Sequence, residues 1–508
     1  MSSSAMNPRI RALTDLDVPT AREFAGLHDW YDGVPGDLSP AGVAAALARV
    51  GAGPAEGDPH DEAHLAAFEE AARVWFGELA AHRANPVPHL MNLDLAGYDR
   101  EYAPARARAA ARAAHLARWP EAIDQAIDAL DRVPAPTAEA LLAGIRGLAE
   151  GLVLGRADAE DAALAAHARL VGHIERLAQD GDPDPAIGGA GLTRLLSASE
   201  AVPVDLTVLA GQAEVERARL RALLDDACDR IAPGQPTATT VAALLVDHPD
   251  ADGVLAAARA LTAEVIAWTA AHDLVPYHDG ECRVGPAPQS RQWAMAMMSW
   301  SAPHEPPGPS WYYVTPPQPT WPPAEQEEWL RVFSRSTLAA ITVHEVAPGH
   351  YSHGLALRHA KSDVRRTLLS EAFVEGWAHY VEEMALEEGF RAGDPSYAAA
   401  VAIEALVRVT RLSCSIGLHT GAMTVEEATQ RFTADAFLAG PAALAEARRG
   451  TFDPTYGRYT WGKLVILELR ERARAAWGGT FSLPRFHRAL LDLGAPPLGL
   501  LATAVERG

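Results

Sequence analysis

Cysteine is scarce in this 508-residue sequence, and its three residues, Cys228, Cys282 and Cys414, are far apart. Their odd number and wide spacing argue against a disulfide framework and against a zinc site built from thiolates. Long apolar runs are also absent, since no stretch of 18 apolar residues occurs and the first residues lack the apolar core of a signal peptide. We therefore expect no membrane span and predict a cytoplasmic protein.

Basic residues are in the minority, with 44 Lys and Arg against 66 Asp and Glu and a net charge of −22. Nucleic acids and anionic lipids are held by clustered Lys and Arg, so this balance argues against both as partners. The hydrophobic content of 48% is ordinary for a globular protein with a core. The length allows one large domain or two to three average ones.

The pattern that is present up to about His272 is helical. Ala- and Leu-rich segments such as 105–119 and 209–231 carry apolar residues at three- and four-residue spacing between Pro-, Gly- and Asp-rich breaks. Ser39 followed by Pro40 predicts a helix start. We predict a mainly α protein in which residues 1–272 form a helical scaffold and residues 273–508 carry the functional site, the two forming one continuous catalytic domain.

Residues 276–323 differ, because twelve prolines rule out a long helix there. Residues 310–315 (SWYYVT) are aromatic and β-branched and predict a short strand. As an edge strand beside an active site it would bind an extended peptide by strand addition, with Tyr313 at the substrate. The alternative is a buried strand within a small sheet.

The stretch HEVAPGH (344–350) lies at the end of a predicted buried helix. In the common zinc motif HExxH, two histidines four residues apart share a helix face, and the Glu beside the first polarises water. Here the spacing is six residues, which on a regular helix turns His344 and His350 about 120° apart. Pro348 removes a helical hydrogen bond and Gly349 tolerates an unusual backbone, so a distortion such as a π-bulge would return His350 to His344. The alternative is that the helix simply ends there.

A second stretch supplies carboxylates, because Glu371, Glu375 and His379 lie at i, i+4 and i+8 and share one face of a predicted helix. Such charges are usually solvated, but Phe373 and Trp377 on the same helix leave little of it freely exposed. A buried carboxylate needs a partner, and a cation is a good one. Two imidazoles and one carboxylate leave a fourth position on zinc open for water, as in catalytic sites.

Together, HEVAPGH and FVEGWAHYVEE resemble the bacterial family known as domain of unknown function 885, whose pattern is HE-x-x-PGH and then EGWA-x-Y-x-E. The segments GLHDWYDGVPGDLSPAG, RLSCSIGLHTGAMTVEEA and FHRALLDLGAPPLGLL resemble its other signatures in the same order, so the resemblance covers nearly the whole chain. That family is similar in turn to helical zinc peptidases of the thimet oligopeptidase and carboxypeptidase Taq groups. The resemblance implies a zincin-like, predominantly α fold with a metal-dependent hydrolase site.

By position, the resemblance implies four residues around the metal: the ligands His344, His350 and Glu375, and the general base Glu345. Glu371 would orient a ligand histidine without touching the metal. His353 is a spare ligand candidate, because three residues after His350 is again a one-face spacing.

The reaction also needs donors for the oxyanion that forms at the attacked carbonyl. The segment DPTYGRYTWGK (453–463) holds two: Tyr459 fits the family pattern, and Tyr456 resembles the tyrosine of the carboxypeptidase Taq group. For each, a plain core or surface aromatic is the alternative. His419 is a further donor candidate, although a lone histidine is more often structural. Arg411 or Lys463 would fix a substrate carboxylate.

The sequence therefore predicts a zinc-dependent hydrolase of small peptides or peptide-like amides, in which Glu345 moves the proton of a metal-activated water. The helical first half would wall a deep cleft, and a homodimer is left open. Three alternatives remain: an amidase or lyase dedicated to one metabolite, a non-haem iron enzyme with the same ligands, and a helical binding protein with a vestigial site.

Overall fold

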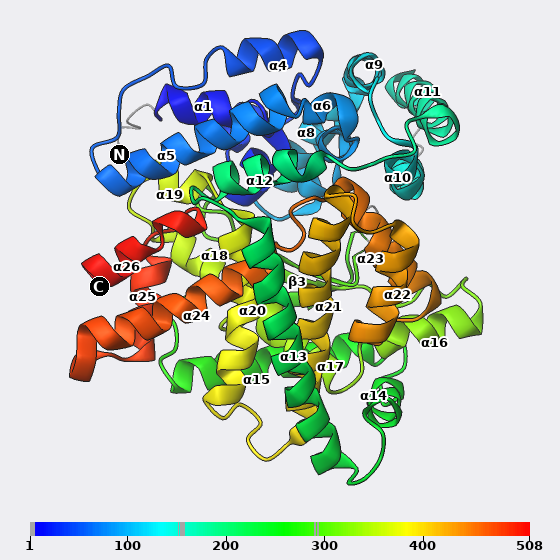
Figure 1. Ribbon diagram of the computed structural model, residues 1–508. Coiled ribbons are helices and arrows are strands. Elements are labelled where there is room, and N and C mark those ends of the chain that lie inside the picture. The colour runs from blue at the N-terminus through cyan, green and yellow to red at the C-terminus, as the bar shows by residue number, and fades with distance from the viewer. Residues whose placement is uncertain (1–5, 151, 153–157, 289–290, 292–293) are drawn as a thin grey trace.

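The computed structural model describes residues 6–150, 152, 158–288, 291 and 294–508. It is 67% helix and 3% strand, so the mainly α prediction is confirmed. Figure 1 shows the amino-terminal helices as an upper layer, with the long helices of the second half of the chain below them.

Short helices joined by turns begin the upper layer. The predicted start at Ser39 is present, because the Ser39 hydroxyl accepts a hydrogen bond from the Gly42 amide and Pro40 is the first helical residue. Helix continues past α5 as a π-helical turn, Arg73–Glu78. The helices of this part are α1 (Pro8–Thr14), α2 (Val18–Thr20), α3 (His28–Tyr31), α4 (Pro40–Leu47), α5 (Pro59–Ala72), α6 (Ala81–Ala84) and α7 (Val87–Leu93).

Four further helices of the upper layer surround a separate hydrophobic core that includes Trp119, Ile123 and Ile174. They are α8 (Ala105–Ala117), α9 (Trp119–Ala129), α10 (Ala135–Gly147) and α11 (Asp158–Asp180). A single helix, α12 (Gly188–Ser199), then leads to the lower layer.

The lower layer is built on the largest hydrophobic core of the described residues, which runs from Leu192 to Ala504. This core joins both predicted regions, since α13, before residue 272, packs along α21, after it. The helices of this layer are α13 (Leu206–Ile231), α14 (Thr237–Val246), α15 (Val254–Ala271), α16 (Pro323–Arg331), α17 (Thr337–Glu345), α18 (His350–Arg358), α19 (Asp363–Thr367), α20 (Glu371–Glu387), α21 (Pro395–His419), α22 (Val425–Ala436), α23 (Gly440–Phe452), α24 (Arg458–Trp477), α25 (Leu483–Leu491) and α26 (Ala502–Arg507).

A small sheet lies between the layers. Its strands β1 (Cys282–Gly285), β2 (Ala296–Ser299) and β3 (Ser310–Val314) follow the order β1-β3-β2, with β1 parallel and β2 antiparallel to β3. The strand predicted at 310–315 is therefore present, but its prediction as an edge strand is wrong. Because β3 is hydrogen-bonded on both sides, it has no free edge to which a substrate peptide could be added.

Tyr313 of β3 is 8% exposed and faces the charged groups of the upper layer, where burial raises its pKa to about 12. Side chains alternate across a strand, so its neighbour Tyr312 faces the other way, and its hydroxyl lies 3.4 Å from Thr342 of α17. Tyr313 therefore does not point towards the helix that carries the first motif.

Buried ion pairs tie the upper layer to the segments around the sheet. Arg291 pairs with both Glu23 and Asp94, and Arg100 pairs with Glu305 at 2.9 Å. Burial disfavours the charged form of Glu23, but Arg291 outweighs it and lowers the pKa of Glu23 to about 2. Each charge is thus matched, as buried charges need to be.

One described helix, α15, has the length and composition of a helix that could cross a membrane, with a mean hydropathy of 1.4. It also carries Arg259 and Glu264, and its buried residues Ala258, Leu261 and Val265 recur at three- and four-residue spacing. That face packs against α17 and β1. An amphipathic core helix meets the same criteria, so α15 is weak evidence for a membrane span.

Candidate metal centre

The chain turns between the two motif histidines. Helix α17 ends at Glu345, α18 begins at His350, and a cis Ala347–Pro348 peptide bond lies in the turn. A Cβ on Gly349 would lie 1.8 Å from the carbonyl oxygen of His344, so any side chain would collide with the backbone. Glycine thus permits the close approach that returns the chain to the end of α17. The distortion predicted at Pro348 and Gly349 is therefore present, but it is a break between two helices and not a π-bulge.

The turn brings His344 and His350 together, with ring centroids 4.7 Å apart and the rings nearly perpendicular. The Nε2 atoms of both histidines lie 3.4 Å from the same oxygen, Oε2 of Glu375 on α20. Two ligand atoms about 2.1 Å from one tetrahedral zinc ion lie about 3.4 Å apart, so this spacing fits a shared ion. Among the described residues, this is the one group of three or more His, Cys, Asp or Glu side chains whose ligand atoms all lie within 4.8 Å of one another.

The electrostatics of the three residues favour a cation. Burial disfavours the charge on Glu375, yet its contacts with both histidines hold its pKa well below the usual range. Burial and Arg408 oppose protonation of His344, but its contact with Glu375 and its hydrogen bond with Glu382 outweigh them and raise its pKa to about 9. The two carboxylates thus favour positive charge at His344, and they would favour a bound divalent cation for the same reason.

Glu345 adjoins the same point from the end of α17. It is 8% exposed, and within the described part of the chain its Oε2 atom has no hydrogen-bond partner. Burial raises the pKa of Glu345, against the attraction of His350 and His344. A carboxyl group in this setting is suited to take up and release a proton.

Glu382 of α20 was missed by the sequence analysis. Its Oε1 atom lies 2.6 Å from Nδ1 of His344, and its Oε2 atom accepts a hydrogen bond from Arg408 of α21 at 3.1 Å. Glu382 follows Glu375 by seven residues, which is two helical turns, so the two share a face of α20. It is also the last Glu of the EGWA-x-Y-x-E pattern, a signal that could have identified it.

Two residues considered for this centre lie outside the group. Glu371, predicted to orient a ligand, pairs with Arg458 at 3.1 Å, and its side chain is 71% exposed. His353 is fully buried, its Nε2 lies 3.2 Å from the carbonyl oxygen of Gly494, and burial lowers its pKa to about 3. His353 is therefore bound to the backbone and does not meet the other ligands.

Helices α20 and α24 cross at two glycines. A Cβ on Gly462 would lie 2.0 Å from the carbonyl oxygen of Ala372, and one on Gly376 would lie 2.6 Å from Cα of Gly462. This contact places the first turns of α24, including Tyr459, beside the part of α20 that carries Glu375. The glycine of the EGW motif is thus explained by helix packing.

The two tyrosine candidates differ in their surroundings. The ring of Tyr459 is flanked by the guanidinium groups of Arg408, Arg411 and Arg458 at 6.0, 5.1 and 5.7 Å from its centroid. Tyr456 is fully buried in a separate hydrophobic cluster between α21, α22 and α23. Only Tyr459 therefore shares a neighbour, Arg408, with the candidate metal centre.

Three other predicted residues are engaged elsewhere. Lys463 is fully buried and pairs with Glu216 of α13 at 3.1 Å. His419 is 1% exposed at the far end of α21, and burial lowers its pKa to about 4. Arg411 forms a two-point ion pair with Glu446 at 2.8 and 2.6 Å. None of them presents a free charged group to a substrate at the centre.

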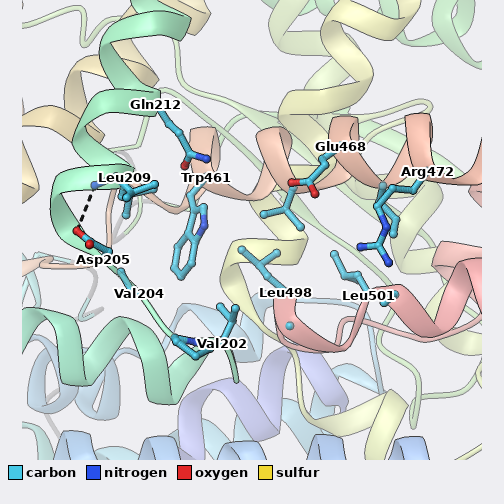
Figure 2. A pocket seen from close by; sticks show the side chains of 16 residues that line it. Val202, Val204, Asp205, Leu209, Gln212, Trp461, Glu468, Arg472, Leu498 and Leu501 are labelled. Atoms are coloured by element: carbon cyan, nitrogen blue, oxygen red, sulfur yellow. Dashed lines mark hydrogen bonds between the residues drawn. The ribbon is translucent and has the colours of Figure 1, made fainter.

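A separate cavity of about 350 Å³ opens between α13, α24 and the segment before α26. Figure 2 shows Trp461, Leu209 and Leu498 facing it, with Glu468 and Arg472 at its edge. None of the residues that line it belongs to the His344, His350 and Glu375 group. This cavity is therefore not the candidate metal centre.

The fold and this site define a large helical protein with an internal centre of two histidines and one glutamate. A family described as bacterial protein of unknown function (DUF885) matches residues 19–505, so the chain belongs to that family. No curated protein matches it.

Two solved structures share the fold. One, from Shewanella oneidensis, is described as a "putative lipoprotein of unknown function" and is 20% identical, with a TM-score of 0.75 and 97% of each chain covered. The other, from Colwellia psychrerythraea, is described as a "putative lipoprotein" and is 17% identical, with a TM-score of 0.79 and 98% of this chain and 97% of that chain covered. At these identities the likeness establishes the fold alone.

Proposed function

We propose that this protein is a zinc-dependent hydrolase of peptide or amide bonds. The supporting observation is the meeting of two imidazole nitrogens at one Glu375 oxygen, with the buried Glu345 carboxyl adjoining them. Three protein ligands leave one position of a tetrahedral ion open. Zinc held there would acidify a water molecule and polarise the carbonyl of the scissile bond.

Two residues of the chain would transfer the proton and stabilise the negative charge that develops on the carbonyl oxygen. Glu345, as a carboxylate, takes a proton from the attacking water and then gives it to the leaving amine nitrogen when the C–N bond breaks. Tyr459 donates its hydroxyl hydrogen to the oxyanion, and the guanidinium groups of Arg408, Arg411 and Arg458 flank its ring. A small peptide or peptide-like amide remains the proposed substrate.

Metal content and hydrolysis test the proposal together. Protein purified without added metal should contain about one zinc ion per chain, as measured by inductively coupled plasma mass spectrometry, and the His344→Ala variant should contain none. A panel of small peptides and amides should be hydrolysed, and Glu345→Gln should keep the zinc while lowering kcat/KM by about 10²–10⁴-fold. Zinc-loaded Glu345→Gln that hydrolyses at the wild-type rate refutes this mechanism.

The same experiments separate the alternatives. Iron in place of zinc would favour non-haem iron chemistry on the same ligands. Cleavage of one metabolite alone would favour a dedicated amidase or lyase, and no hydrolysis at all would favour a binding protein. A cytoplasmic location is also proposed, and because the two solved relatives are described as lipoproteins, cell fractionation should test it.

A further inference from the structure

The two histidines of the candidate centre are held very differently. Nδ1 of His344 lies 2.6 Å from a Glu382 oxygen, which is a short, charge-assisted hydrogen bond. Nδ1 of His350 is buried and has no hydrogen-bond partner among the described residues. A carboxylate at Nδ1 fixes both the tautomer and the ring orientation of a histidine. Of the two histidines, only His344 therefore has its Nδ1 atom fixed by a hydrogen bond to another side chain.

Glu382 is itself held in place. Its side chain is fully buried, Arg408 donates a hydrogen bond to its Oε2 atom at 3.1 Å, and Nδ1 of His379 lies 3.6 Å from its Oε1 atom. Its backbone carbonyl accepts a hydrogen bond from the hydroxyl of Tyr397 at 3.3 Å. A carboxylate with both oxygens engaged and no access to solvent cannot turn away from His344.

We propose that Glu382 is a positioning residue for metal binding, which aims Nε2 of His344 at the point shared with His350 and Glu375. This inference rests on the proposed metal site but goes beyond its ligands. By accepting the hydrogen on Nδ1, Glu382 leaves the lone pair of His344 on Nε2. Arg408 keeps the carboxylate facing His344 and balances its charge.

The neighbouring Glu383 provides a matched control. It lies on the same helix and forms ion pairs with Lys463 and Arg219 at 2.5 and 2.6 Å, but it contacts no candidate ligand. Glu382→Gln and Glu383→Gln therefore each remove one carboxylate charge from an ion pair of α20. Only the first removes the charge that orients His344.

Zinc affinity, measured on the full chain by competition with a chromophoric chelator, tests the inference without relying on hydrolysis. Glu382→Gln should bind zinc about 10–100-fold more weakly than the wild type, and Glu383→Gln should bind it within about threefold. The visible spectrum of the cobalt-substituted protein should change in the first variant alone, because the ligand field depends on the direction of the His344 lone pair. Equal zinc affinity in both variants overturns the inference while leaving the proposed function intact.

Glu382→Asp is the second variant, in case Glu382→Gln does not fold. It keeps the charge opposite Arg408 but shortens the side chain by one methylene, which breaks the 2.6 Å contact. Its zinc affinity should be lower than that of the wild type, and wild-type affinity would contradict the inference. A wild type that binds no zinc overturns both this inference and the proposed function.

Discussion

Gly349→Ala is the most direct test of how the candidate centre is assembled. The new Cβ would lie 1.8 Å from the carbonyl oxygen of His344 and 2.4 Å from that of Val343, and neither backbone atom can turn aside as a side chain can. To reach an ordinary contact of about 3.4 Å, the turn must open by more than 1 Å. His350 would move with it, away from His344 and Glu375.

We expect this opening to act on both stability and metal binding. Forced overpacking costs about 1–3 kcal/mol in the free energy of unfolding. Withdrawal of one ligand should weaken zinc binding at least about 100-fold, or about 2.7 kcal/mol. Urea unfolding and chelator competition measure the two effects separately.

Gly211→Ala is the matched control for that experiment. Gly211 lies within α13, and a Cβ there would meet no atom within 4 Å. The same substitution should therefore stabilise the helix by about 0.5–1 kcal/mol and leave zinc affinity unchanged. If Gly349→Ala binds zinc as tightly as Gly211→Ala, the close approach at Gly349 does not position His350.

Two further predictions concern a hydroxyl group and a buried histidine. Tyr459→Phe should lower kcat by about 10²–10³-fold with little change in KM, because the oxyanion loses its hydrogen-bond donor. Tyr456→Phe should leave both kcat and KM unchanged. Equal losses of kcat in the two variants would show that the hydroxyl groups act on folding and not on the reaction. His115 is fully buried, its Nε2 lies 3.0 Å from the carbonyl oxygen of Asn92, and burial lowers its pKa from 6.5 to about 3. As pH falls from 6.5 towards 3, the unfolded chain gains a proton that the folded chain does not, so this residue should lower the free energy of unfolding by about 1.4 kcal/mol per pH unit. Urea titrations at several pH values in this range give the free energy of unfolding at each pH. It should fall less steeply with decreasing pH in His115→Gln than in the wild type, and an identical pH dependence would contradict the assignment.

The sequence was most informative where chemistry depends on local spacing. The alternation of helices and breaks predicted the mainly α fold, and the two motifs identified the residues that the structure gathers. Glu382 could also have been found, because its seven-residue distance from Glu375 is a local helical relation. Local patterns cannot show which other segment of the chain packs against a given face of a helix or pairs with a given edge of a strand. The central position of β3 depends on its pairing with both β1 and β2, and the β1 partner of Ser310 is Cys282, on the other side of a proline-rich segment.

Lys463 and Tyr459 illustrate the same limit. Both stand in one short segment that resembles a catalytic motif, and on α24 they are four residues apart and share a face. They lie one helical turn apart along the axis, so each meets different neighbouring helices. Lys463 enters a buried ion pair with α13, while Tyr459 lies among the arginines near the centre. Only the three-dimensional packing of α24 against α13 and α21 distinguishes these two outcomes.

The helix crossing at Gly376 and Gly462 has a consequence for synthesis of the chain. His344 and Glu375 emerge from the ribosome well before Gly462, and the largest core is closed only by residues near Ala504. The centre cannot reach its final packing until α24 has been made, because α24 packs against the helix that carries Glu375. Truncation of the chain before α24 should therefore abolish metal binding even though His344, His350 and Glu375 are all retained.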